Sequence, residues 1–214
     1  MRVIAVPVKS LARAKGRLSS ALAPMERAAL TLAMLEDVLD AATVLPGWQT
    51  WVISPDQSVL EVAARRRARP ILEEDPGLVA AVRQVEEEAA GADALAVVLG
   101  DLPLITPEAL AAALQTLGTV VAAPSASDGG TNVLLRRPPD AIPALFGTQS
   151  FRRHREAAEA HDIPFAEVRA PELAFDLDRV ADLGALLGSP RRARSRAICL
   201  EMGLADRLSL RKRA

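Results

Sequence analysis

Three aspartates stand in two short clusters, each at the end of an apolar run. Asp101 follows the run 94–99, which has the pattern of a buried strand, and Asp176 and Asp178 form a D-x-D pair further on. A buried carboxylate costs free energy unless it is paired or binds a metal ion. If both strands end at one edge of a sheet, the three carboxylates can meet there, and such oxygen ligands suit Mg2+ and substrate phosphates. The first hypothesis is therefore a phosphate-handling enzyme.

A group of basic side chains follows the first predicted strand, residues 2–8. Lys9, Arg13, Lys15 and Arg17 lie within nine residues of one another. Lys and Arg both neutralise phosphate oxygens, so this segment can hold a triphosphate. Its spacing is not that of a P-loop. The alternative is a solvated basic loop, and composition alone does not separate the two.

Two further segments have the residue types of an anion site. The turn 128–132 combines two glycines with a hydroxyl and an amide, and such a turn can direct N–H groups at an anion. Ser150 is the predicted N-cap of a helix over 150–161, and a helix start favours phosphate or carboxylate. His154 lies one turn later on the same helix face. The alternatives are an ordinary turn, simple capping and a histidine used for packing.

Strand patterns alternate with helix patterns along the chain, which favours an α/β domain with a largely parallel sheet. Ligands of such sheets bind beyond the carboxyl ends of the strands, where both the basic loop and Asp101 would lie. Asp56 is a predicted helix cap. The predicted strands are 2–8, 48–54, 69–72, 94–99, 119–123, 131–136, 165–169 and 174–176, and the predicted helices are 24–44, 76–90, 107–117, 150–161 and 179–187.

Length and composition indicate one domain over 1–188 with a basic extension over 189–214. The chain has 214 residues and a net charge of −1, so nothing suggests a general nucleic-acid binder. Its one cysteine, Cys199, excludes an intramolecular disulfide and is interpreted as a packing residue. No apolar run is long enough for a membrane span and no signal peptide is visible, so we expect a cytoplasmic protein.

The extension 189–214 carries seven arginines and one lysine. We interpret it as a terminal helix that packs through Ile198, Leu200 and Met202. The alternative is a surface for a partner or for a second copy of the chain, as in a homodimer.

In combination and in this order, the motifs resemble the guanylyltransferases of coenzyme F420 biosynthesis. These enzymes activate 2-phospho-L-lactate or phosphoenolpyruvate with GTP. The resemblance covers about residues 3–187, and it rests on six stretches of sequence. They are the opening 6–18, the helix 26–37, Gly100–Leu104, Gly129–Asn132, the segment 146–154 with Phe146, Gly147, Ser150, Phe151 and His154, and Asp176–Asp178.

The resemblance implies a three-layer nucleotidyltransferase fold of the glycosyltransferase A type, with a mostly parallel mixed sheet, and Mg2+ as cofactor. By position, it implies roles for three groups of residues. The metal ligands are Asp101, Asp176 and Asp178; the contacts to the three-carbon acid are Thr131, Gly147 and Ser150; the triphosphate contacts are Lys9, Lys15 and Arg17. Asp101 and Lys15 are the expected catalytic residues.

The chain departs from the family pattern in three places. An asparagine common in the family is missing from the segment 77–79, and 125–128 reads Ser-Ala-Ser-Asp where an arginine is usual. Gln149 stands where a second glycine is common. These departures concern nucleotide recognition and the acid pocket, so they leave the choice of acid open.

The sequence therefore predicts a Mg2+-dependent enzyme that transfers GMP from GTP to phosphoenolpyruvate or 2-phospho-L-lactate and releases pyrophosphate. Three alternatives remain open at this point. They are a related enzyme that uses 3-phosphoglycerate, a molybdenum-cofactor-type nucleotidyltransferase, and a non-catalytic nucleotide-binding homologue.

Overall fold

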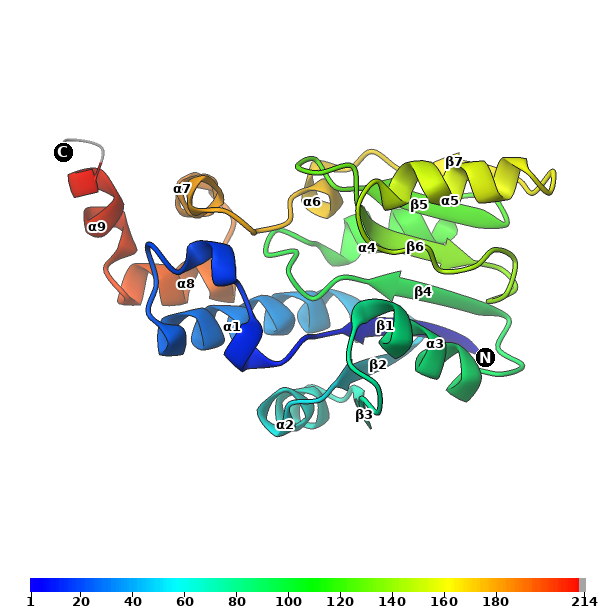
Figure 1. Cartoon of the computed structure of the whole chain (residues 1–214), viewed down its shortest axis with the longest axis horizontal. Helices are drawn as coiled ribbons and strands as arrows, with labels where there is room; N and C mark the ends of the chain where they lie inside the picture. Colours follow the sequence, from blue (N-terminus) through cyan, green and yellow to red (C-terminus); the bar gives the residue numbers. More distant parts are fainter. Residues whose placement is uncertain (212–214) are drawn as a thin grey trace.

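The structure is a computed structural model that describes residues 1–211, with the side chains of Leu210 and Arg211 left out. One seven-stranded sheet has the order β3-β2-β1-β4-β6-β5-β7 (Figure 1). Every pairing is parallel except those of β6, which runs antiparallel to both of its neighbours. The strands are β1 Arg2–Pro7, β2 Gln49–Ser54, β3 Arg69–Leu72, β4 Ala94–Val98, β5 Val120–Pro124, β6 Thr131–Arg136 and β7 Phe165–Glu167.

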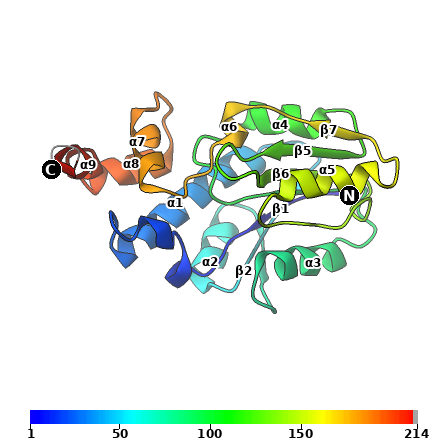
Figure 2. The ribbon, with the colours of Figure 1, turned by 45° about the horizontal axis from the view of Figure 1, so that its top comes forward.

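Helices cover both faces of this sheet. On one face pack α1 (Pro24–Ala42), α2 (Gln57–Arg65) and α4 (Pro107–Gln115). On the other face pack α3 (Leu78–Glu88) and α5 (Ser150–Glu159), as Figure 2 shows. The central strand β4 is buried on both faces, as expected of a parallel strand between two helical layers. This arrangement confirms the predicted three-layer α/β fold.

The sheet brings the ends of distant strands to one edge. Because β1 pairs in parallel with β2 and β4, the segments after Pro7, Ser54 and Val98 leave the sheet on the same side. Two short 3-10 turns, η1 Leu11–Arg13 and η2 Gly16–Leu18, shape the basic loop after β1. Since β6 is antiparallel, Thr131 at its start lies at this carboxyl edge as well. All the predicted site segments therefore share one edge of the sheet.

Four helices follow β7: α6 Pro171–Ala174, α7 Val180–Gly188, α8 Arg194–Glu201 and α9 Leu204–Arg211. The last three gather at one end of the molecule beside α1 (Figure 1), around a separate apolar cluster. Cys199 is buried in that cluster, which confirms its packing role. Ile198 and Met202 also pack there, whereas Leu200 is 44% exposed, so its predicted packing role is wrong. No helix within residues 1–211 is both long and apolar enough to cross a bilayer.

A buried carboxylate on α1 ties the extension to the domain. Asp37 accepts hydrogen bonds from the backbone N–H groups of Arg194 and Ser195 and from the Ser195 hydroxyl, at 2.6 to 3.0 Å. These are the unpaired N–H groups that begin α8, so Asp37 caps that helix from another part of the chain. Burial raises the pKa of Asp37, and the three donors oppose that rise. The basic segment 189–211 is thus anchored on α1.

The predicted strand over 174–176 is wrong. Residues 171–174 form the single helical turn α6, with Pro171 at its first position, where proline is tolerated. Phe175 then ends the helix in an extended conformation, and the D-x-D pair lies in the connection to α7. The apolar residues Ala174 and Phe175 alone do not distinguish a short strand from the end of a helical turn.

Candidate active site

A cavity of about 340 Å³ opens at the carboxyl edge of the sheet. Its wall comes from the basic loop after β1, from α1, from the segment between β3 and α3, from the end of β4, and from the D-x-D connection. The lining residues are Pro7, Val8, Lys9, Arg13, Ala14, Lys15, Gly16, Arg17, Thr31, Glu73, Leu78, Ala81, Leu99, Gly100, Asp101 and Asp178. A volume of this size is typical of small-ligand sites.

The ammonium group of Lys15 lies between two carboxylates in this cavity. Its Nζ donates to Oδ2 of Asp101 at 2.7 Å and to Oδ1 of Asp178 at 2.9 Å, and the Lys15 side chain is 7% exposed. Arg17 approaches the other oxygen of Asp178 at 3.5 Å. The Lys15 backbone is left-handed, with φ 51°, an uncommon conformation outside glycine. The chain adopts it where the two 3-10 turns meet, and this places the ammonium group in the cavity.

Burial and charge act against each other at this cluster. Burial alone would lower the pKa of Lys15, but the negative charges of Asp101 and Asp178 outweigh it, so the pKa is raised. Burial would likewise raise the pKa of Asp178, yet the positive charge of Lys15 holds it below its usual range. Lys15 is therefore protonated and Asp178 ionised at neutral pH, and the ammonium group lies between the two carboxylate side chains.

Asp176 has different partners from the other two aspartates. Its oxygens accept hydrogen bonds from the hydroxyls of Ser125 at 2.7 Å and Ser127 at 3.1 Å, in the loop between β5 and β6. Burial raises the pKa of Asp176, the negative charge of Asp101 adds to the rise, and the serine hydroxyls oppose it. These serines occupy the segment where the family pattern has an arginine. In this chain that segment orients an acidic side chain.

The three aspartates do not form one metal-binding group in the structure. Among residues 1–211, no three acidic, histidine or cysteine side chains gather closely enough to hold an ion. The structure instead places Lys15 where Asp101 and Asp178 face each other. A role for Asp101, Asp176 and Asp178 in Mg2+ binding stays a prediction. Oδ1 of Asp101 is buried without a hydrogen-bond partner, and such an orphaned oxygen fits a hard cation.

The residues predicted to bind the triphosphate are all present at the cavity. Lys9, Lys15 and Arg17 line it together with Arg13. Sequence reasoning gave no role to Glu73, which also lines the cavity and lies outside every motif. Only the position of Glu73, immediately after the short strand β3, would have placed it at the carboxyl edge.

The predicted acid-binding hydroxyls belong to a separate, closed network. Oγ of Ser150 donates to Oγ1 of Thr131 at 3.2 Å, and Oγ1 of Thr131 lies 3.0 Å from Nδ1 of His154. The other ring nitrogen of His154, Nε2, accepts the backbone N–H of Leu145 at 2.9 Å. The three side chains are 2% exposed or less. The structure thus brings Thr131, Ser150 and His154 together, and it buries them.

His154 is neutral in this network. Burial, with the nearby positive charges of Arg136 and Arg153, lowers its pKa to about 3. Because Nε2 accepts the Leu145 N–H, the single ring proton is on Nδ1 and is donated to Thr131. The sequence left open whether His154 packs or binds a ligand. In the structure it connects β6 to the loop 145–147.

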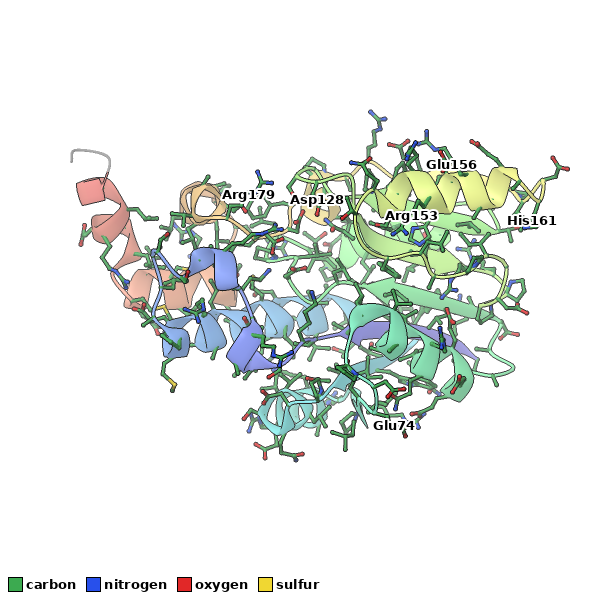
Figure 3. The ribbon with its side chains drawn as sticks, in the orientation of Figure 1. Glu74, Asp128, Arg153, Glu156, His161 and Arg179 are labelled. Carbon is green, nitrogen blue, oxygen red and sulfur yellow. The ribbon has the colours of Figure 1, made fainter. Side chains whose placement is uncertain are left out.

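The loop that carries Gly147 is fixed from α5. Arg153, labelled in Figure 3, donates to the carbonyls of Leu145 and Phe146 at 2.7 and 3.0 Å. Gly147 itself is exposed and has φ 118°, a conformation that favours glycine. Of the three predicted acid contacts, only Gly147 is open to solvent. Neither it nor Thr131 and Ser150 lines the cavity around Lys15.

The predicted N-cap role of Ser150 is wrong. Gln149 occupies the cap position with φ 55° and makes no side-chain capping bond, and Ser150 is the first helical residue. Its hydroxyl reaches across to Thr131 instead of back to the helix N–H groups. The left-handed backbone at 149 suits glycine, which is the residue common at this position in the family pattern.

Comparison with known proteins decides the family. A family model described as "Guanylyl transferase CofC like" matches residues 1–205. The chain belongs to this guanylyltransferase family. Among curated relatives, the phosphoenolpyruvate guanylyltransferase of Sphaerobacter thermophilus is 44% identical over 87% of this chain and 92% of its own length. The 3-phospho-D-glycerate guanylyltransferase of Phenylobacterium zucineum is 40% identical over 79% and 82%. The 2-phospho-L-lactate guanylyltransferase of Haloarcula marismortui is 37% identical over 86% and 84%.

Solved structures confirm the nucleotidyltransferase fold. A protein from Desulfovibrio desulfuricans G20, provisionally called a nucleotide-diphospho-sugar transferase, superposes with a TM-score of 0.79 at 18% identity, covering 97% of this chain and 98% of its own. A nucleotidyl transferase from Methanothermobacter thermautotroptrophicus has a TM-score of 0.60 at 16% identity, covering 87% and 95%. At these identities the likeness establishes the fold alone.

Proposed function

We propose that this protein transfers the GMP group of GTP to phosphoenolpyruvate, with 2-phospho-L-lactate as the alternative acceptor, and releases pyrophosphate in coenzyme F420 biosynthesis. The observation that carries the proposal is the cavity at the carboxyl edge, in which an ionised Lys15 sits between Asp101 and Asp178 beside three further cations. Family membership over residues 1–205 and the names of the relatives support the choice of GTP and of a phosphorylated three-carbon acid.

The charges of the cavity suit this chemistry. A phosphate oxygen of the acid attacks the α-phosphorus of GTP in line, a P–O bond forms, and the bond to pyrophosphate breaks. The attacking oxygen is already anionic at neutral pH, so the residues must position and neutralise charge and need not remove a proton. Lys9, Lys15 and Arg17 line the cavity, and in this proposal they hold the triphosphate and then the departing pyrophosphate. Mg2+ on Asp101 and Asp178 would supply further charge neutralisation.

The acceptor side lies toward the loops between β5 and β6 and before α5. Figure 3 shows Asp128 of the first loop near the start of α5. The closed network of Thr131, Ser150 and His154 lies beneath these loops and holds the Gly147 backbone in place. In the proposed function the acid binds against this backbone, with its phosphate turned to the Lys15 cavity.

The proposal is tested by pyrophosphate release from GTP with phosphoenolpyruvate, 2-phospho-L-lactate and 3-phosphoglycerate in turn, with and without Mg2+. Mass spectrometry then identifies the guanylylated acid. We expect product with phosphoenolpyruvate, and only with Mg2+. Product with 3-phosphoglycerate alone would mean that this protein uses the acid in the name of the Phenylobacterium relative, and not phosphoenolpyruvate. Release from none of the acids would contradict the proposal.

A further inference from the structure

Glu73 is a third carboxylate in the cavity, and unlike Asp101 and Asp178 it makes no ion pair with a described cation. It lines the same cavity as the basic loop, but it belongs to the segment between β3 and α3. Asp101 and Asp178 are compensated by Lys15, but no ion pair within residues 1–211 compensates Glu73, so this part of the wall suits a ligand group that donates hydrogen bonds better than a phosphate. The cavity thus combines a cationic part with a part suited to a donor.

The segment that carries Glu73 is held firmly. The Glu73 backbone N–H donates to the carbonyl of Ser54 at 3.0 Å, which attaches it to the end of β2. Gln84 of α3 donates to the carbonyl of Leu72 and accepts the N–H of Glu74, at 2.9 and 3.1 Å. The side chain is therefore presented by a fixed backbone, as a recognition group should be.

One oxygen of Glu73 has a structural partner and the other does not. Oε1 accepts the backbone N–H of Gly77 at 2.7 Å, just before α3 begins. No hydrogen bond or ion pair within residues 1–211 reaches Oε2. The neighbouring wall is apolar and comes from Val8, Leu78 and Ala81. A flat heterocycle can pack on such an apolar surface. A carboxylate at its rim then accepts hydrogen bonds from the N–H groups on one edge of the ring.

We infer that Glu73 is a specificity-determining residue that accepts the N1–H and the exocyclic amino group of a guanine base. The inference rests on the proposed function and names the part of the cavity that selects its nucleotide. Guanine presents two adjacent donors on one edge. Adenine presents an acceptor and a donor on the corresponding edge, so its ring nitrogen would face the carboxylate unfavourably. The hydrogen bond from Gly77 holds the Glu73 carboxylate beside the segment 77–79.

Direct binding tests this assignment without the acid present. Isothermal titration calorimetry with Mg2+ compares GTP, inosine triphosphate, which lacks the exocyclic amino group, and ATP. Each hydrogen bond to a charged acceptor is worth roughly tenfold in affinity. The parent should bind GTP about tenfold more tightly than inosine triphosphate and about 100-fold more tightly than ATP.

Three variants separate recognition from structure. Glu73→Ala should reduce both ratios to about twofold or less. Glu73→Gln keeps an oxygen for the Gly77 N–H but replaces one acceptor by a donor, so it should lose most preference for GTP and keep its melting temperature. Glu74→Gln is the matched control, because Glu74 lies at the lower edge of the molecule in Figure 3, outside the cavity lining. It should behave as the parent does.

Two results would overturn the inference. Unchanged ratios in Glu73→Ala would show that another group reads the base. An equal loss of affinity for all three nucleotides would mean that Glu73 contacts the ribose, which they share, or only holds the loop at Gly77. A parent that selects GTP but transfers no GMP would contradict the proposed function and leave the inference standing. If the parent transfers GMP but Glu73→Ala leaves the affinity ratios unchanged, the proposed function stands and the inference about Glu73 is wrong.

Discussion

The cavity around Lys15 and the network around His154 lie at the same edge of the sheet, but their polar groups are in opposite environments. The first is open and charged, with an ammonium group between two carboxylates. The second is closed and neutral, because each described hydroxyl and ring nitrogen in it is bound to another protein group. Charged groups that would meet a ligand line an open cavity, even where they are largely buried like Lys15, whereas groups that only fix a backbone are enclosed and bonded to one another.

The comparison predicts the largest loss of activity in the charged cavity. Asp101→Asn removes a charge that faces Lys15 and, in the proposed function, Mg2+. We expect kcat to fall by about 10³-fold while far-ultraviolet circular dichroism stays unchanged. The exposed Asp140→Asn serves as the control. A variant with most of its activity and an unchanged Mg2+ requirement would remove Asp101 from the mechanism.

The closed network should appear in the pH dependence of stability. His154 has a folded pKa of about 3, against about 6.5 when unfolded, so only the unfolded chain takes up its proton between these values. Its contribution is therefore complete above about pH 6.5 and is lost as the pH falls towards 3. From pH 7 to about 4.5 the parent should lose about 2 to 3 kcal/mol more than His154→Gln, measured by urea unfolding. Equal losses would mean that His154 takes up a proton without unfolding.

A third prediction asks whether the basic loop serves the nucleotide alone. Lys15→Ala should raise the KM for GTP about tenfold and that for the acid less than twofold, because in the proposed function its ammonium group contacts the triphosphate. Arg65→Ala, at the exposed end of α2, is the control. If the KM for the acid rises as much as the KM for GTP, the Lys15 cavity does not bind GTP alone but also contacts the acid.

The smallest effect is expected at Ser150. Ser150→Ala removes the hydrogen bond to Thr131 and should cost about 1 kcal/mol of unfolding free energy, with the KM for GTP unchanged. Ser150→Asp puts a charge into a neutral, buried network and should be destabilised several times as much. A stable Ser150→Asp variant would show that the network opens to solvent.

Periodicity predicted the sheet and its helices, because each element buries a regular apolar face. Helix α1 begins at Pro24 as expected, and Asp56 caps α2 as predicted, with its side chain accepting the N–H of Ser58. Both features depend on residues close together in the sequence. The carboxyl edge as the place of the site also followed from topology alone.

The arrangement of the site could not be predicted, because its partners are far apart in the chain. Lys15 pairs with carboxylates 86 and 163 positions away. Nothing local shows that its backbone turns left-handed to reach them. Ser150 is a good capping residue by type, yet a hydroxyl on the neighbouring strand competes for it. The D-x-D pair was expected to act together, but Asp176 bonds to the serines of the β5–β6 loop and Asp178 pairs with Lys15.

The antiparallel strand β6 has a consequence for how such enzymes can diversify. Because β6 runs against its neighbours, the loop 125–130 is a hairpin connection at the very edge where the parallel strands end. Insertions or substitutions in a hairpin loop leave the pairing of β1, β2 and β4 untouched. In the proposed function this loop borders the acid, so changes in it alter the acid side and leave the paired strands that carry the basic loop and Asp101 in place. Three relatives that carry the name guanylyltransferase, but name three different acids, fit that modular history.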